Sequence, residues 1–201
     1  MLRKNIIGLD YARKHHSQGR ILRKNWARPF AIIFLGVLGS QTIATSSPNL
    51  PTSSVYRLHF YHAHTRERLD VIYRRGDHYE SEAQTRISQY LRDYRTGDIR
   101  EYDPHVLDLL HDLMVSLGRP DAEIEVVCGY RTPQTNEYLR THGHGVARRS
   151  LHMQAMAIDI RIRGVSTSKL RDAALALHRG GVGYYAASNF VHVDVGRVRR
   201  W

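Results

Sequence analysis

The sequence predicts an α+β fold in a single domain, with a small antiparallel sheet and flanking helices. Apolar residues between positions 106 and 117 recur at helical spacing. Short apolar runs such as 124–128 and 190–195 are typical of buried strands. Helices come before strands that look antiparallel, which is the order found in α+β proteins. A chain of 201 residues has room for one such domain and a tail.

The N-terminal region differs in composition from the rest of the chain. Residues 1–44 contain eight Lys and Arg residues and one acidic residue, and residues 31–38 are apolar. This pattern is typical of an export signal, and the apolar segment is short for a transmembrane helix. An uncleaved anchor, which would tether the protein to the inner membrane through residues 30–44, is the alternative. Residues 45–54 are rich in Ser, Thr and Pro and are predicted to be a linker, so the folded domain would span residues 55–201.

The charge distribution argues against nucleic-acid binding. The formal net charge is +11, but +7 of it lies in residues 1–44 and only +4 in the rest of the chain. The excess is therefore concentrated in the tail and does not mark a basic face on the folded domain. Cys128 is the one cysteine, so an intramolecular disulfide is excluded. We expect a buried structural thiol there, because Cys128 ends an apolar run.

The domain is expected to begin with a hairpin. Residues 55–60 and 68–73 have strand character and flank a polar turn. His59, His62 and His64 are expected on one exposed face of this hairpin.

Helix-start signals and apolar periodicity predict the elements that follow. Asp103 is suited to cap a helix that has Pro104 at its first position, and Thr132 precedes Pro133 in the same way. Gly118 is expected to end the first of these two helices. The remaining elements are expected, in chain order, as helices at 81–92, 104–117, 133–141 and 166–178, and strands at 124–128, 155–162, 180–185 and 190–195.

Three side chains suggest a metal site. His152 is followed seven residues later by Asp159, and His192 lies on a second strand-like run. Two imidazoles and one carboxylate are the ligand set of an open catalytic zinc site. A carboxylate in an apolar run such as 155–162 is costly unless it is paired or binds a metal. With 13 histidines in the chain, the His-to-Asp spacing alone would be weak evidence.

Five segments resemble, in the same order, the murein endopeptidase K group of zinc peptidases. This group is related to the D-Ala-D-Ala carboxypeptidases and dipeptidases that act on peptidoglycan. The resemblance extends back to about Val55 and covers about three quarters of the chain. The matching segments are 128–132, 145–152, 157–159, 180–185 and 189–201. Ala155, where the family commonly has Gly, and Val195, where Thr is usual, depart from the pattern.

The resemblance implies a fold of the hedgehog/D-Ala-D-Ala peptidase type and one zinc ion per chain. It also implies cleavage of stem-peptide crosslinks in the cell wall by an enzyme that acts on peptidoglycan. Together with the export signal, this predicts a periplasmic location. We also expect a monomer that binds no nucleic acid. A non-catalytic peptidoglycan-binding module and a D,D- or L,D-carboxypeptidase are the alternatives.

The other site residues follow from what such a peptidase needs. Asp194 shares a strand face with His192, so it is the first candidate for the base that takes a proton from water, or it orients the ligand His192. Related enzymes often have an acid at the position of Asn189, whose amide cannot serve as a base. In the resembled family the position of Arg131 binds a substrate carboxylate or carbonyl. Ser150 is expected either to bind substrate or to cap the loop before His152.

Overall fold

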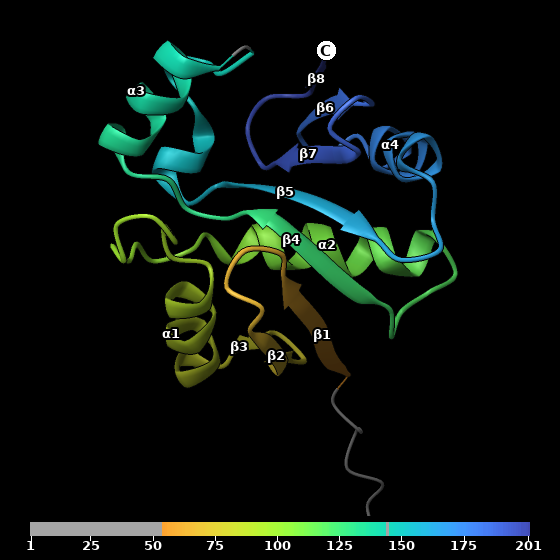
Figure 1. Cartoon of the computed structure of the whole chain (residues 1–201). Coiled ribbons are helices and arrows are strands. Elements are labelled where there is room, and N and C mark those ends of the chain that lie inside the picture. The colour runs from red at the N-terminus through yellow and green to blue at the C-terminus, as the bar shows by residue number, and fades with distance from the viewer. Residues whose placement is uncertain (1–53, 144) are drawn as a thin grey trace, which may run out of the picture. The chain divides into compact units, whose positions relative to one another are not determined.

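A mixed sheet of eight strands forms the centre of this computed structural model, which describes residues 54–143 and 145–201 (Figure 1). The strands are, in spatial order, β3 (His78–Tyr79), β2 (Arg68–Arg75), β1 (Val55–His62), β4 (Glu123–Cys128), β5 (Ala157–Ile162), β7 (Phe190–Asp194), β6 (Gly181–Tyr185) and β8 (Arg199–Arg200). The pairs β1–β4 and β6–β8 are parallel, and the other pairs are antiparallel. The α+β class and the single domain are therefore confirmed. The prediction of a small antiparallel sheet is wrong, because β1 joins the N-terminal hairpin to β4 in one continuous sheet.

The helices begin where the sequence predicts them. Asp103 accepts a hydrogen bond from the backbone N–H of His105, and Thr132 accepts one from that of Thr135. Each cap satisfies a backbone donor that the first turn of a helix leaves free. The helices are α1 (Ser81–Tyr90), α2 (Pro104–Ser116), α3 (Pro133–His142), α4 (Thr167–Ala176) and a short 3-10 helix, η1 (Leu151–Gln154).

The hydrophobic core lies on one face of the sheet, under α2 and α4. Figure 1 shows α2 lying behind β4 and β5, and α4 beside β6 and β7. Alternate strand residues, such as Ile124, Ile160 and Val191, are fully buried and belong to one core cluster with α2 residues such as Leu110. Because side chains alternate across a strand, the residues between them project from the other face of the sheet. We call this second face the open face, and the candidate site lies on it.

Three predictions concern the periphery of the domain: the face of the histidines on β1, the N-terminal region and the linker. His62 is fully buried rather than exposed with His59, because the two lie on opposite faces of β1. The predicted export signal or anchor at 1–44 and nearly all of the linker at 45–54 lie outside the described residues. Within residues 54–143 and 145–201, each helix is too short or too polar to span a membrane.

Candidate active site

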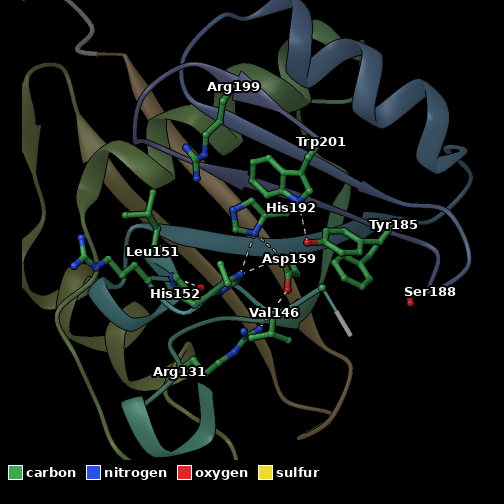
Figure 2. Close-up of a pocket in the computed structure, with 15 residues that line it drawn as sticks. Arg131, Val146, Leu151, His152, Asp159, Tyr185, Ser188, His192, Arg199 and Trp201 are labelled. Atoms are coloured by element: carbon green, nitrogen blue, oxygen red, sulfur yellow. Dashed lines mark hydrogen bonds and ion pairs between the residues drawn. The ribbon is translucent and has the colours of Figure 1, made fainter. Parts of the chain in front are cut away.

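Three side chains from three elements meet on the open face of the sheet. His152 comes from η1, Asp159 from β5 and His192 from β7. Nε2 of His152, Oδ1 of Asp159 and Nδ1 of His192 lie 2.9–3.1 Å from one another (Figure 2). All three residues are buried. The structure thus brings together the residues that the sequence suggests as metal ligands.

Strand register and one backbone carbonyl hold this cluster together. Asp159 lies directly opposite His192 in the antiparallel pair β5–β7, so both side chains project from the same face. Nδ1 of His152 donates to the carbonyl oxygen of Gly129 at 2.7 Å. Nε2 of His152 therefore faces the other two side chains. When the ring is neutral, its one N–H is at Nδ1, so Nε2 carries no proton.

The short helix η1 sets the position of His152. Oγ of Ser150 accepts a hydrogen bond from the backbone N–H of His152 at 3.3 Å and so caps the helix. Ala155 ends the helix in the left-handed conformation, with φ at 53°. An alanine in this conformation carries a strain of about 1 kcal/mol that a glycine would avoid. The polar loop expected before His152 therefore closes with one tight, capped turn.

The cluster fits a small divalent cation. A tetrahedral zinc ion with bonds of about 2.0–2.2 Å holds its ligand atoms about 3.3 Å apart, close to the separations observed here. Burial favours neutral imidazole, but the adjacent carboxylate of Asp159 outweighs it and raises the pKa of His152 to about 10. Burial opposes the charge on Asp159 too, yet the two histidines hold its pKa well below the usual range. The buried carboxylate of Asp159 thus favours a positive charge beside it, which a metal cation could supply once its ligands are deprotonated.

Cys128 lies beside the same cluster, which the sequence analysis did not predict. Its sulfur and ligand atoms of His152 and Asp159 lie within 4.8 Å of one another. The pairing of β4 with β5 shifts register between Val126 and Cys128, and Cys128 then lies opposite Asp159. A bulge of this kind re-aims a side chain, and no sequence signal marks it. Cys128 is buried as expected, and its Sγ accepts a hydrogen bond from Arg131 at 3.2 Å.

Asp194 lies on the far side of His192 from the cluster. Its Oδ2 is 3.0 Å from Nε2 of His192 and also accepts from Arg199 at 2.7 Å. Its Oδ1 accepts from the backbone N–H groups of Gly181 and Gly196, at 3.0 and 2.9 Å. Although full burial opposes the charge, these donors hold the pKa of Asp194 well below its usual range. Of the two roles that the sequence leaves open, these contacts favour the orientation of His192.

Arg131 and Ser150 both lie next to the cluster. Arg131 follows β4 and precedes α3, as predicted, and its side chain is buried. Its Nη1 donates to Oδ1 of Asn136 at 3.3 Å, and its Nη2 lies 3.8 Å from Oδ2 of Asp159. The guanidinium group is therefore held in one place beside the candidate metal ligands.

A cavity of about 250 Å³ opens over the cluster (Figure 2). It is lined by the three cluster residues, by Arg131 and Ser150, and by three residues that the sequence analysis missed: Tyr185, Arg199 and Trp201. The indole Nε1 of Trp201 donates to the hydroxyl of Tyr185 at 3.0 Å. No chemical motif marks Trp201 in the sequence, so only the folded chain shows that its side chain lines the cavity. The buried cluster of His152, Asp159 and His192 therefore forms part of the lining of this cavity.

Comparison with known proteins places this chain in a family. Residues 51–201 match the family model described as peptidoglycan L,D-endopeptidase MepK. A probable peptidoglycan L,D-endopeptidase MepK from Haemophilus influenzae is 40% identical over 167 residues, which cover 83% of this chain and 88% of that protein. The peptidoglycan L,D-endopeptidase MepK of Escherichia coli K12 is 36% identical over 160 residues, which cover 80% of this chain and 84% of that protein. The chain therefore belongs to the MepK family of peptidoglycan L,D-endopeptidases.

Proposed function

We propose that this chain is a zinc-dependent peptidase that hydrolyses crosslinks between the stem peptides of peptidoglycan. The observation that carries the proposal is the buried cluster of His152, Asp159 and His192 at the floor of a cavity. The relatives are named L,D-endopeptidases, which favours an L,D bond within the crosslink over removal of a terminal residue. The family also supports a hedgehog/D-Ala-D-Ala peptidase-like arrangement for residues 55–201.

His152, Asp159 and His192 are the proposed ligands of one zinc ion. Cys128 could replace His192 in this set, since it too lies beside His152 and Asp159. We favour His192, because Asp194 holds its ring from behind, whereas the sulfur of Cys128 already accepts a hydrogen bond from Arg131. When bound, zinc would polarise the scissile carbonyl and lower the pKa of a water molecule toward about 7.

The surrounding residues would bind and orient the stem peptide. Arg131 is suited to a carboxylate or carbonyl of the substrate, because a fixed guanidinium presents parallel N–H donors. Arg149 also lines the cavity and adds positive charge at its exposed rim, which suits an anionic stem peptide. Ser150 caps η1 and also lines the cavity, so we propose substrate binding as a second role for its hydroxyl. Asp194 would hold the ring of His192 in the orientation that suits metal binding. Proton transfer is its alternative role.

The proposal extends to the location of the enzyme. Residues 1–44 would direct export to the periplasm or tether the protein to the inner membrane through residues 30–44, and residues 45–54 would link them to a monomeric domain. The charge distribution supports export in preference to nucleic-acid binding.

The test is digestion of purified crosslinked sacculi by the full chain, with the released muropeptides resolved by mass. We expect crosslinked dimers to disappear and monomers to accumulate. A chelator and the substitution His152→Ala should both abolish this change, because each removes the metal. His78→Ala is the matched control, since His78 is an exposed histidine on β3.

Metal analysis of the same proteins separates the outcomes. We expect one zinc ion in the wild type and in Cys128→Ser, and its loss in His152→Ala. An unchanged muropeptide profile from folded, zinc-loaded wild type would contradict the endopeptidase proposal and favour the non-catalytic wall-binding module. Release of terminal D-Ala without loss of dimers would favour the carboxypeptidase.

A further inference from the structure

Strand β6 contributes one side chain to the cavity. Gly183 lies opposite His192 in the pair β6–β7, and Tyr185 lies opposite Phe190. Because side chains alternate, Gly181, Gly183 and Tyr185 share the face that carries His192. The two glycines leave that face bare, so Tyr185 is the residue that β6 presents toward the site.

The space above Gly183 is filled by Trp201. A Cβ atom at Gly183 would lie 2.7–2.8 Å from three atoms of the indole ring, so a larger residue there would displace it. The backbone of Trp201 is fixed to β6, since its carbonyl accepts from the N–H of Tyr184 at 3.0 Å and its N–H donates to Val182 at 3.2 Å. The centroid of the indole ring lies 5.2 Å from that of His192.

Trp201 determines which way the hydroxyl of Tyr185 can donate. The indole Nε1–H can only donate, so Tyr185 is the acceptor in their 3.0 Å hydrogen bond. The proton of the phenol is therefore free for another acceptor. The ring of Tyr185 stacks on Phe190, with centroids 4.5 Å apart and planes within 16°. Figure 2 shows this hydroxyl on the cavity side, turned toward His192 and Asp159.

Packing alone does not explain this pair. Trp201 remains 51% exposed, so about half of its surface gains nothing from burial. The backbone of Trp201 is nevertheless held on β6 by two hydrogen bonds, and its indole ring lies over Gly183. Such an arrangement fits a residue that fixes a neighbour in the cavity wall.

We propose that Tyr185 is a catalytic residue that donates a hydrogen bond to the oxygen of the scissile carbonyl, and that Trp201 is its positioning residue. This inference rests on the proposed endopeptidase function. The carbonyl oxygen gains negative charge as the amide is attacked, and a donor fixed beforehand stabilises that charge more than it stabilises the bound substrate. The proton stays on Tyr185 throughout, so no covalent step involves the phenol.

The experiment measures kcat and KM of the zinc-loaded full chain on a purified crosslinked muropeptide dimer. Tyr185→Phe should lower kcat about 100-fold, the effect of removing one donor to a developing oxyanion, and should change KM less than threefold. Trp201→Phe keeps an aromatic ring but loses the Nε1–H, so kcat should fall about tenfold, as expected for one weakened hydrogen bond.

Tyr184→Phe is the matched control. Tyr184 is the adjacent tyrosine on the other face of β6, where the guanidinium of Arg171 lies 4.6 Å from its ring centroid. This variant should retain kcat and KM within twofold. Metal content and circular dichroism of all three variants should match the wild type. The groups removed are the hydroxyls of Tyr184 and Tyr185 and the indole N–H of Trp201, and none of them is a proposed metal ligand or part of the core.

The outcomes separate this inference from the proposed function. If the wild type cleaves the dimer and Tyr185→Phe keeps its kcat within twofold, Tyr185 is not the donor. A raised KM with unchanged kcat would likewise overturn the inference, since it indicates a contact made equally in the ground state. A folded, zinc-loaded wild type without activity would overturn the proposed function, and this inference would fall with it.

Discussion

At the scale of single residues, Asp194 shows how buried charge can be used to orient a neighbour. Its carboxylate is fully buried, and two backbone N–H groups, Arg199 and His192 all contact its oxygens. A carboxylate surrounded by donors in this way has little capacity left to take a proton from water. It is well placed to hold Nε2 of His192, so that Nδ1 faces Asp159.

Asp194→Asn tests this interpretation. An amide at this position cannot accept from all of these donors, so His192 should lose its fixed orientation. We expect zinc affinity to fall about 10- to 100-fold, the usual effect of removing such a partner. The free energy of unfolding should fall by about 2 kcal/mol, because Arg199 loses its counter-charge. Competition with a chelator measures the first effect, and urea unfolding measures the second.

Asp121→Asn is the control, because Asp121 is exposed in the turn before β4. If Asp194→Asn binds zinc as tightly as the wild type but is inactive, the orienting role would be wrong and proton transfer would become the better explanation.

At the scale of elements, the end of β4 connects the core to the site. The backbone N–H of Tyr130 donates to the carbonyl of Leu91, just after α1, at 2.8 Å. The neighbouring carbonyl of Gly129 holds Nδ1 of His152. A Cβ atom on Gly129 would lie 2.6 Å from the oxygen of Leu91, so this close approach of two backbones requires glycine.

Gly129→Ala should therefore disturb both stability and metal binding. The clash is with a backbone atom, which cannot turn away as a flexible side chain could. We expect the free energy of unfolding to fall by about 1–3 kcal/mol, as in other overpacked sites. Zinc affinity should fall as well, because the carbonyl that holds His152 has to move. Thermal unfolding and chelator competition are the measurements, and wild-type values in both would contradict the proposed coupling.

At the scale of the whole molecule, the free energy of unfolding should fall in mild acid, because the buried side chain of His62 resists protonation in the folded state. Nδ1 of this fully buried histidine accepts from the backbone N–H groups of His64 and Thr65, at 3.2 and 3.3 Å. Those bonds require an unprotonated Nδ1. Burial, together with the nearby charge of His64, lowers the pKa of His62 to about 4.

The sign of the effect follows from the unfolded chain, in which an ordinary histidine has a pKa of about 6.5. Between pH 6.5 and 4 the unfolded state binds a proton at His62 that the folded state does not, so stability decreases as the pH falls. We expect a loss of about 3 kcal/mol from this residue between pH 7.5 and 4. Urea unfolding at several pH values measures it.

His62→Asn should reduce this pH dependence, because an amide can still accept a hydrogen bond but does not titrate in this range. His78→Asn, at an exposed position, should leave the pH dependence unchanged. Equal slopes for wild type and His62→Asn would show that other groups cause the loss.

The sequence by itself determined the local features of this protein. The caps at Asp103 and Thr132, the strand alternation and the candidate ligands could be read directly, because each depends on residues that are close in the chain or on a motif. The α+β class followed from the order of these elements.

Only the tertiary structure decided how these elements combine. The parallel pairing of β1 with β4 made the sheet large and mixed, and the bulge before Cys128 turned its thiol toward the cluster. The return of the chain along β6 brought Trp201 to Tyr185. Each of these depends on contacts between residues far apart in the sequence, and such contacts form only when the packed core fixes which face of each strand is buried.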